Sequence, residues 1–362
     1  MVPRLLAAEV AFLLIAATTS VYADDLDVVL TKAMEGTKTP ALAAVEIRDG
    51  KIAHEGVRGV RRNDGPDPAL VADAWLIGSN GKPMTATLIA KLVDRGVLSW
   101  DAPLAKMLPD LQDTIRPEYR SLTLTQLLSH RAGLPENVSD LDFFKTFYGD
   151  ARPLPEQRNA YITRALKDAP AAAPGSKVSY SNTGFLIAAV IAERATGSSY
   201  EDLMRREVFQ PLGMNSVGFG TTPVGQPIGH NDGKPIAKPE DSNPLMFAPA
   251  GNIHLSMRDW ARFCADQMDG THGQGKLLTP ASYQLMQTAQ PGGTSGLGWG
   301  VQVAIGGQKG PVLVHAGSDG NWYALVALFP ESGRGLLVAA NAGEDMGGDK
   351  AAKAALQALL AR

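Results

Sequence analysis

The spacing of hydrophobic and polar residues predicts antiparallel strands at both ends of this chain and helices between them. At the N-terminal end, Leu26 to Met34 has helical spacing and Ala41 to Arg48 is strand-like. Asp49-Gly50 is a strong hairpin-turn signal, and Lys51 to Val60 predicts the returning strand. The chain is therefore expected to begin with a helix and an antiparallel pair of strands.

The C-terminal end carries similar strand signals. Val312 to Ala316 and Trp322 to Pro330 predict two strands. The turn at 331–335 leads to a third strand over Leu336 to Ala340, and a final helix is expected over Lys350 to Leu360. Because the two antiparallel clusters lie at opposite ends of the chain, they favour one sheet closed by both termini, with the middle of the chain inserted between its strands.

The middle of the chain is predicted to be largely helical. Thr85 to Val97 carries apolar residues at helical spacing. Thr123-Leu124-Thr125-Gln126 matches a capping box, which predicts a helix that begins there and ends at Gly133. These helices would lie between the two strand clusters in sequence.

A further helix is expected over Thr183 to Ala195, capped by Asn182 or Thr183 and ending at Gly197. The segment 221–250 is rich in proline, glycine and asparagine and is predicted to be irregular. The fold class is therefore α+β: an antiparallel sheet built from both chain ends with flanking helices, plus a mainly helical lobe.

Composition and charge narrow the function classes. The chain has 362 residues, of which 44% are hydrophobic and 20% charged, as in ordinary globular proteins. One domain is expected over 24–362, with a sheet lobe at about 24–78 and 291–362 and a helical and irregular lobe at about 79–290. The formal net charge is -3 and no basic block occurs, which argues against nucleic acid as a partner.

The N-terminus has the pattern of a signal peptide. Arg4 is a positive n-region, Val10 to Ala17 is a short apolar stretch, and Val21-Tyr22-Ala23 is a small-residue cleavage pattern. Residues 1–23 are therefore expected to be removed, with the mature protein periplasmic or secreted and without a membrane span. Glu9 interrupts the apolar character, so an uncleaved anchor and a buried N-terminal helix stay as alternatives.

The single cysteine, Cys264, cannot form an intramolecular disulfide. It follows aromatic and apolar residues at helical spacing, so a buried, inert thiol is expected. The fold must then be stabilised by its core and not by disulfides.

The segment Ser79-Asn80-Gly81-Lys82 could supply a nucleophile and its base. A serine hydroxyl needs a base to take its proton, and a lysine can be that base when burial lowers its pKa. Helical positions i and i+3 share one face, which would bring the two side chains together. The alternative is a plain helix entry, with Ser79 as the N-cap and Lys82 in solvent. Pro83 complicates both interpretations.

Two later segments could complete such a site. In Tyr180-Ser181-Asn182, a tyrosine near a lysine could relay a proton to a leaving group, and Asn182 could hold a substrate amide or orient the lysine. The alternative is a buried tyrosine beside an asparagine helix cap.

The second of these segments is His315-Ala316-Gly317-Ser318, on a predicted strand. An exposed strand beside the site could pair with an extended substrate. The backbone N–H groups of Ser318 and Ser79 could then stabilise an oxyanion. The alternative is a strand-end histidine with Gly317 at a bulge.

Taken together and in order, these segments resemble the serine β-lactamase and penicillin-binding protein superfamily, in particular class C β-lactamases, D-alanyl-D-alanine carboxypeptidases and family VIII esterases. The resemblance extends from about Ala41 to Ala342. The segments that carry it are Ile77-Gly78-Ser79 with Lys82-Pro83, Leu127 to Pro135, Pro174-Gly175 with Tyr180-Ser181-Asn182, Phe209 to Met214, Pro249 to Asn252, Gly296 to Gly300, and His315-Ala316-Gly317.

The resemblance implies a sheet lobe beside a helical lobe with the site between them. It implies Ser79 as the nucleophile, Lys82 as the proton acceptor, and Tyr180 as the partner base and later the acid toward the leaving group. Asn182 would support the substrate and Lys82, while Ser79 and Ser318 would supply the oxyanion N–H groups. The family requires no metal and no organic cofactor, and its substrates are small-molecule esters, amides or lactams.

One departure bears on the substrate. Many class C β-lactamases have Lys-Thr-Gly where this chain has His315-Ala316-Gly317. Ala316 has no hydroxyl, and a histidine is mostly neutral at pH 7. A substrate carboxylate should therefore be held less well, which favours esters or uncharged amides.

The sequence is compatible with four functions to different degrees. An esterase-like serine hydrolase is favoured, a β-lactamase or D-alanyl-D-alanine carboxypeptidase is the first alternative, and a non-catalytic penicillin-recognising domain is the second. The intact Ser79, Lys82 and Tyr180 argue against the binding domain. An α/β-hydrolase is disfavoured because the elbow-like 316–320 leads into a predicted strand and not a helix. The six histidines are scattered and include no H-E-x-x-H, so no metal site is expected.

Overall fold

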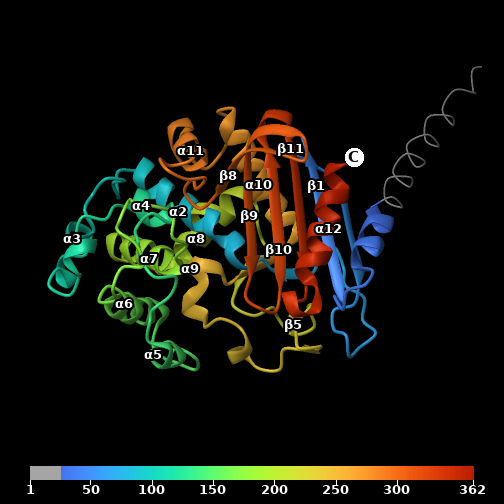
Figure 1. The fold of residues 1–362 in the computed structure, drawn as a ribbon, viewed down its shortest axis with the longest axis horizontal. Coiled ribbons are helices and arrows are strands. Elements are labelled where there is room, and N and C mark those ends of the chain that lie inside the picture. The colour runs from blue at the N-terminus through green and yellow to red at the C-terminus, as the bar shows by residue number, and fades with distance from the viewer. Residues whose placement is uncertain (1–25) are drawn as a thin grey trace, which may run out of the picture.

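The computed structural model describes residues 26–362, and the predicted signal peptide at 1–23 lies outside that range. A six-stranded antiparallel sheet has the order β2-β1-β11-β10-β9-β8. Strand β1, near the N-terminus, pairs with β11, near the C-terminus, with Leu42 opposite Ala340 (Figure 1). The predicted sheet built from both chain ends is therefore confirmed. Its strands are β1 (Ala41–Arg48), β2 (Lys51–Gly59), β8 (Gly300–Ile305), β9 (Gln308–Ser318), β10 (Tyr323–Phe329) and β11 (Arg334–Ala340).

Both faces of this sheet are covered by helices. Leu42 and Ala44 of β1 pack in one apolar cluster with α12 (Gly348–Leu360) and the helix at 26–34. Ala43 and Val45 belong to the larger cluster, which contains α10 (Met257–Thr271). Because successive strand residues point to opposite faces, the alternate residues of β1 serve both layers. The run Ala41–Arg48 is accordingly apolar almost throughout.

The second lobe contains most of the remaining helices, which surround α7 (Figure 1). The helix α7 packs against α2, α4, α6 and α9. A small separate sheet has the order β3-β7-β4. The elements are α2 (Lys82–Asp94), α3 (Leu104–Met107), α4 (Leu124–Leu128), α5 (Leu141–Lys145), α6 (Leu154–Ala165), α7 (Asn182–Thr196), α8 (Tyr200–Met204), α9 (Ala248–Gly251), α11 (Pro280–Gln287), β3 (Ala74–Leu76), β4 (Gly218–Phe219), β5 (His230–Asn231), β6 (Lys234–Pro235) and β7 (Ile253–Ser256).

Local signals were most accurate where a side chain bonds the backbone of a residue a few positions away. The capping box is present at α4: the Thr123 side chain accepts from the Gln126 N–H and the Gln126 side chain accepts from the Thr123 N–H. The predicted extent of this helix to Gly133 is wrong, since α4 ends at Leu128. Gly133 is in the left-handed region (φ +70°), where a Cβ would lie 2.1 Å from the Ala172 carbonyl oxygen.

The boundaries of α7 corrected one prediction and confirmed another. Its N-cap is Ser181, not Asn182 or Thr183, because the Ser181 hydroxyl accepts from the Gly184 N–H. Asn182 is thereby left as the first helical residue, with its side chain free for other contacts. The helix ends at the left-handed Gly197, as predicted.

The strand β8 was not predicted. It lies at the edge of the sheet and pairs only with β9. None of its residues is buried, and Val303 is 88% exposed. A strand with one neighbour and no buried face lacks the alternation that sequence patterns detect.

Candidate active site

Ser79 lies in a short 3-10 turn, η1 (Gly78–Gly81), which joins β3 to α2. Residues at i and i+3 eclipse each other in a 3-10 helix. Lys82 Nζ accordingly lies 2.9 Å from Ser79 Oγ. Pro83 occupies the start of α2, where a missing N–H costs nothing. The plain helix-entry alternative is wrong, because Lys82 is fully buried and Ser79 is not the N-cap.

The Lys82 amine is surrounded by oxygen atoms, and no carboxylate of residues 26–362 pairs with it. Its Nζ donates to Asn182 Oδ1 at 2.7 Å and to the Ala250 carbonyl oxygen. Burial lowers the pKa of Lys82 well below its usual value, while the more distant Glu136 carboxylate works in the opposite direction. A neutral amine that uses its two N–H groups on Asn182 and Ala250 keeps its lone pair for the Ser79 hydroxyl proton.

Tyr180 contacts the other side of the same hydroxyl. Its OH donates to Ser79 Oγ at 2.7 Å, and Lys82 Nζ lies 4.8 Å from the centre of its ring. Although 40% of the residue is exposed, desolvation raises the pKa of Tyr180 to about 12, and the hydrogen bond to Ser79 opposes this rise. Tyr180 therefore holds its proton at neutral pH. In the resting site this makes it a proton donor, while Lys82 is the group able to accept.

Asn182 is held in one orientation by contacts on both sides of its amide. Its Oδ1 accepts from Lys82, and its Nδ2 donates to Asn137 Oδ1 at 3.0 Å. The backbone N–H groups of Asn182 and Thr183 bond the Glu136 carbonyl oxygen at the start of α7. The structure thus brings Asn182 to Lys82, and adds Asn137, which the sequence did not single out.

The end of β9 lies directly against η1, and two glycines allow this approach. A Cβ at Gly78 would lie 2.5 Å from the Ser318 backbone nitrogen. A Cβ at Gly317 would lie 2.7 Å from the Ser79 nitrogen and 2.1 Å from the Ile77 carbonyl oxygen. No side chain fits at either position. Because both residues are glycines, the two segments that carry the backbone N–H groups of Ser79 and Ser318 can lie directly against each other.

His315 is a neutral side chain in this structure. Its Nδ1 lies 2.7 Å from the Ala316 carbonyl oxygen. Burial, followed by the nearby Lys82 charge, lowers the pKa of His315 to about 3. Neither His315 nor Gly317 lines the cleft described below. His315 therefore offers no positive charge to a substrate carboxylate near neutral pH.

His130 is a second residue of the site, beside Asn137, to which the sequence assigned no role. Its ring stacks on the Tyr180 ring, with 4.5 Å between centroids and 28° between planes. The Ser181 N–H donates to its Nδ1 at 3.0 Å, which places the proton of the neutral ring on Nε2. Burial, then Lys82 and His315, lower the pKa of His130 to about 3. The signal was available only as part of the shared segment Leu127 to Pro135, where no role was assigned.

The backbone of His130 is also unusual. Its φ is +58°, which is uncommon for a residue other than glycine. Its carbonyl oxygen accepts from the Ser179 N–H at 2.7 Å, and the Arg131 carbonyl oxygen accepts from the Gly175 N–H at 2.7 Å. These contacts fasten the segment that carries Tyr180 to the end of α4. Strained residues of this kind persist where the surroundings over-determine them.

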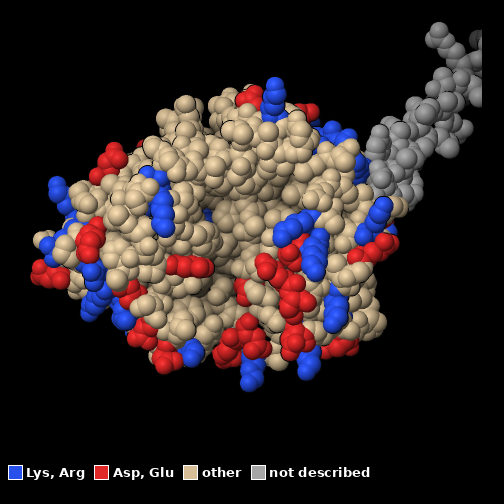
Figure 2. Space-filling model, viewed as in Figure 1, with Lys and Arg blue, Asp and Glu red and all other residues tan. Residues whose placement is uncertain are grey.

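Ser79 lines a cleft of about 400 Å³ between the lobes. A hollow in the middle of the molecular face is visible in Figure 2. Its lining residues are Ser79, Glu136, Asn137, Leu141, Phe144, Tyr180, Asn182, Asn243, Phe247, Ala250, Gly251, Ser318 and Asp319.

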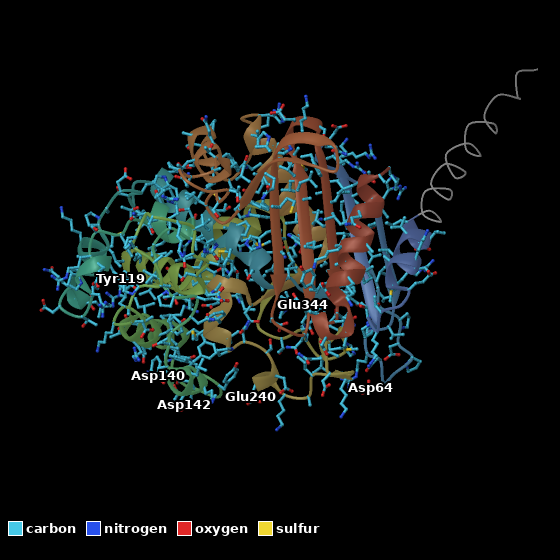
Figure 3. The ribbon with its side chains drawn as sticks, viewed as in Figure 1. Asp64, Tyr119, Asp140, Asp142, Glu240 and Glu344 are labelled. Atoms are coloured by element: carbon cyan, nitrogen blue, oxygen red, sulfur yellow. The ribbon has the colours of Figure 1, made fainter. Side chains whose placement is uncertain are left out.

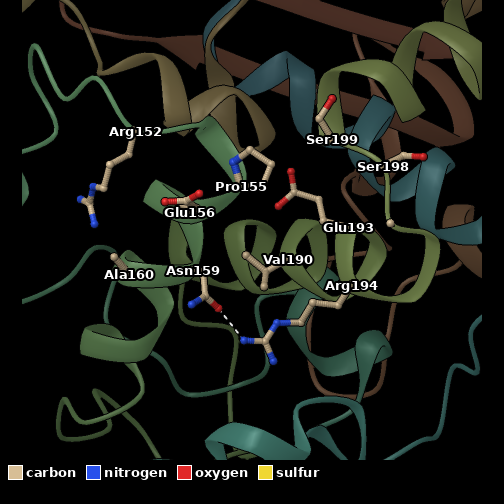
Figure 4. Close-up of a pocket in the computed structure, with 11 residues that line it drawn as sticks. Arg152, Pro155, Glu156, Asn159, Ala160, Val190, Glu193, Arg194, Ser198 and Ser199 are labelled. Atoms are coloured by element: carbon tan, nitrogen blue, oxygen red, sulfur yellow. Dashed lines mark hydrogen bonds between the residues drawn. The ribbon is translucent and has the colours of Figure 1, made fainter.

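A larger cavity of about 580 Å³ lies elsewhere, between α6, α7 and the turn before α8 (Figure 4). It contains none of the predicted site residues. Its Arg194 is paired with Asn159 and Asp110, and its Glu193 with Arg158. The larger cavity is therefore not the one that contains the predicted site residues.

Three further observations concern residues 26–362 as a whole. Within this range no group of three or more His, Cys, Asp or Glu side chains is placed to hold a metal ion. No helix in the range is long and apolar enough to cross a bilayer. Cys264 is buried, as predicted, and burial raises the pKa of its thiol.

A family profile described as Beta-lactamase matches residues 26–360. The chain belongs to the beta-lactamase family. Among its relatives, "Penicillin-binding protein 4" of Amycolatopsis lactamdurans is 28% identical, over 81% of this chain and 78% of that protein. "D-alanyl-D-alanine-carboxypeptidase/endopeptidase AmpH" of Escherichia coli (strain K12) is 25% identical, over 72% and 69%. "Esterase EstB" of Burkholderia gladioli is 30% identical, over 58% and 55%.

Solved structures confirm the beta-lactamase-family fold. The octameric penicillin-binding protein homologue from Pyrococcus abyssi has a TM-score of 0.76 at 24% identity, covering 94% of this chain and 77% of that one. The structure of SurE with D-Leu has a TM-score of 0.74 at 22% identity, covering 94% and 75%. The family is one of serine hydrolases that includes esterases and carboxypeptidases, so the relatives support a hydrolase.

Proposed function

We propose that this protein is a serine hydrolase that forms an acyl-enzyme on Ser79 and acts on esters, or on amides without a carboxylate. One observation carries the proposal. Ser79 Oγ lies 2.9 Å from the buried Lys82 amine and 2.7 Å from the Tyr180 hydroxyl. A serine between a base with a lowered pKa and a protonated tyrosine has both an acceptor for its proton and a donor for a leaving group.

The reaction would proceed by two proton transfers around one covalent step. Neutral Lys82 takes the Ser79 proton while Oγ bonds to the substrate carbonyl carbon. The N–H groups of Ser79 and Ser318 stabilise the charge on the carbonyl oxygen. The bond to the leaving oxygen or nitrogen then breaks as Tyr180 gives it a proton. Lys82 returns a proton to Tyr180, and water releases the acyl group by the same steps.

The preference for an ester rests on the β9 edge of the site. A neutral His315 followed by Ala316 supplies neither a cation nor a hydroxyl for a substrate carboxylate. The similarity to "Esterase EstB" of Burkholderia gladioli supports the same choice. A carboxypeptidase or β-lactamase activity is the alternative, favoured by the similarity to AmpH and penicillin-binding proteins. A non-catalytic domain is disfavoured, because it would need no buried lysine beside a serine.

A side-by-side assay tests this proposal. The protein is incubated with p-nitrophenyl butyrate, a chromogenic cephalosporin and a D-alanyl-D-alanine peptide, and intact-mass spectrometry follows the acyl group on Ser79. Ester turnover well above the other two supports the esterase. Higher turnover of the cephalosporin or the peptide would select the alternative. The double variant His315→Lys, Ala316→Thr should raise activity on the cephalosporin, and no gain would remove the argument from β9.

We further propose that the protein is exported and acts in the periplasm or outside the cell. The support is the pattern of Arg4, the apolar Val10 to Ala17 and the small residues before Asp24. N-terminal sequencing of the protein recovered from cell fractions tests this. A mature chain beginning at Asp24 in the periplasm or medium is expected, and an intact N-terminus in the cytoplasm would contradict it.

A further inference from the structure

The charges that line the cleft are unbalanced. Among the described residues that line it, Glu136 and Asp319 are carboxylates, and none is an arginine or a lysine. Lys82 lies behind Ser79, fully buried, with its pKa lowered by burial. The pKa values of His130 and His315 are both lowered to about 3. A substrate in the cleft therefore meets negative charge and no compensating cation near neutral pH.

The two carboxylates differ in how they are held. Asp319 is saturated: its oxygens accept from the Ser242 hydroxyl at 2.7 Å and from the backbone N–H groups of Asn321 and Trp322 at 2.9 and 3.0 Å. In contrast, no hydrogen bond or ion pair holds the Glu136 carboxylate within residues 26–362, and Glu136 is exposed. Asp319 is thus a fixed part of the wall, whereas Glu136 is free to bind a partner.

Other acidic side chains lie close in sequence to residues that line the cleft. Asp140 and Asp142, at the start of α5, lie with Glu240 along the same edge of the molecule (Figure 3). The pKa of Tyr148 is raised by burial and then by Asp319 and Glu240, so both carboxylates act on the surroundings of Tyr148. Their field adds to that of Glu136 at the cleft and decreases within about one Debye length.

Apolar side chains form a further part of the cleft lining, called here the apolar wall. Leu141, Phe144 and Phe247 line the cleft, and Leu141 is 66% exposed. An apolar side chain exposed beside a catalytic serine gains by burial against a substrate. Asn137 and Asn182 connect this wall to Lys82, which contacts Ser79. With Tyr180 serving the leaving group in the proposed mechanism, the acyl group of a substrate would lie along this wall.

We infer that the preferred substrate carries an ammonium group on an apolar acyl chain, and that Glu136 is the residue that selects it. This inference rests on the proposed function, since it names the substrate class of the same site. Glu136 would pair with the ammonium, and the three apolar side chains would cover the chain between it and the carbonyl. An anionic acyl group would be repelled by Glu136 and Asp319 together.

Three p-nitrophenyl esters of similar length test the inference: heptanoate (neutral), 6-aminohexanoate (cationic) and hydrogen adipate (anionic). The ratio of kcat/KM for the cationic and neutral esters should fall about fivefold in Glu136→Gln, the upper end of the range for an exposed charged pair. The matched control is Asp142→Asn, which removes a charge close in sequence to the cleft lining but not from the lining itself. It should change the ratio less than twofold.

Each outcome separates the two proposals. An unchanged ratio in Glu136→Gln, or an equal fall in Asp142→Asn, overturns the role of Glu136 while ester hydrolysis stands. If no ester is hydrolysed, the proposed function fails, and binding still tests the inference. Calorimetry on Ser79→Ala should then show heptylammonium binding more tightly than heptanoate, with the difference lost when Glu136→Gln is added. Equal binding of the two ions would overturn it.

Discussion

Two buried cations in this protein have the same exposure and opposite chemistry. Lys82 and Arg158 are both fully buried. Arg158 lies between two carboxylates, with Nη2 at 2.6 Å from Glu193 and 2.9 Å from Glu201, and these partners raise its pKa against the effect of burial. The hydrogen bonds of Lys82 within the described part of the chain go to neutral oxygens of Ser79, Asn182 and Ala250, and burial lowers its pKa. A buried cationic side chain is structural where carboxylates pair with it, and reactive where its neighbours are neutral.

The contrast extends to what each group does for the fold. The Arg158 network joins α6, α7 and α8, since its members come from all three helices. Lys82 joins η1, α7 and α9 through Ser79, Asn182 and Ala250. An uncompensated buried charge is costly, so removing one partner from the first network should destabilise the fold. Removing the amine of Lys82 should cost activity instead.

The largest effect is expected from Ser79→Ala. Without the nucleophile no acyl-enzyme can form, and turnover of any substrate should fall by at least about 10³-fold. The lost hydroxyl faces the cleft and not the core, so core packing is unchanged. The melting temperature should therefore stay within a few degrees of wild type. Steady-state kinetics with thermal unfolding checks both statements. Turnover at the wild-type rate would remove Ser79 from the mechanism.

The largest change in stability is expected from Arg158→Met. The substitution leaves Glu193 and Glu201 buried without their cation, which should lower the free energy of unfolding by about 3–5 kcal/mol. Urea unfolding measures it. The triple variant with Glu193→Gln and Glu201→Gln should recover part of the loss, because it removes the unpaired charges. A loss below 1 kcal/mol in Arg158→Met would show that the network is dispensable.

The matched variant in the site is Lys82→Met, which keeps the length of the side chain without its amine. Activity should fall about 100-fold or more, the scale of a lost general base. Its stability should not fall as that of Arg158→Met does, because no carboxylate loses its partner. A loss of stability with full activity would reverse the assignment of the two cations.

The pH dependence sharpens the same comparison. Since the folded pKa of Lys82 is below its ordinary value of 10.5, the unfolded chain binds more protons between the two values. The contribution of Lys82 to the free energy of unfolding therefore increases as the pH rises through that window and decreases as the pH falls through it. Wild-type kcat/KM should rise with pH as Lys82 loses its proton, and the rise should be absent from the residual activity of Lys82→Met. A pH profile with the same limb in both proteins would assign that limb to another group.

The smallest effect is expected from His130→Asn. Asparagine tolerates the left-handed backbone at this position, but its side chain cannot stack on Tyr180. Ring contacts of this kind contribute about 0.5–1.5 kcal/mol, so kcat should fall by up to about tenfold with little change in KM. If His130 positions Tyr180, the substitution should have no further effect in Tyr180→Phe. An equal, additive loss in both backgrounds would make its role merely structural.

Local sequence signals predicted the parts of the fold that depend on neighbours along the chain. The hairpin at Asp49-Gly50 separates β1 and β2, and the capping box at Thr123 begins α4. Where a boundary depended on a distant contact, prediction failed. The N-cap of α7 is Ser181, whose hydroxyl also donates to the Pro135 carbonyl oxygen. The edge strand β8 was missed because its residues are not buried.

For the site, the sequence by itself determined which residues could react. Ser79 and Lys82 are three positions apart on one turn, so their contact is a local consequence of backbone geometry. Everything that makes the pair reactive is tertiary. Asn182 and Ala250, far away in the chain, take up the amine N–H groups, and the surrounding core excludes the water that would keep it charged. A pKa depends on the surroundings in space, which a local pattern does not describe.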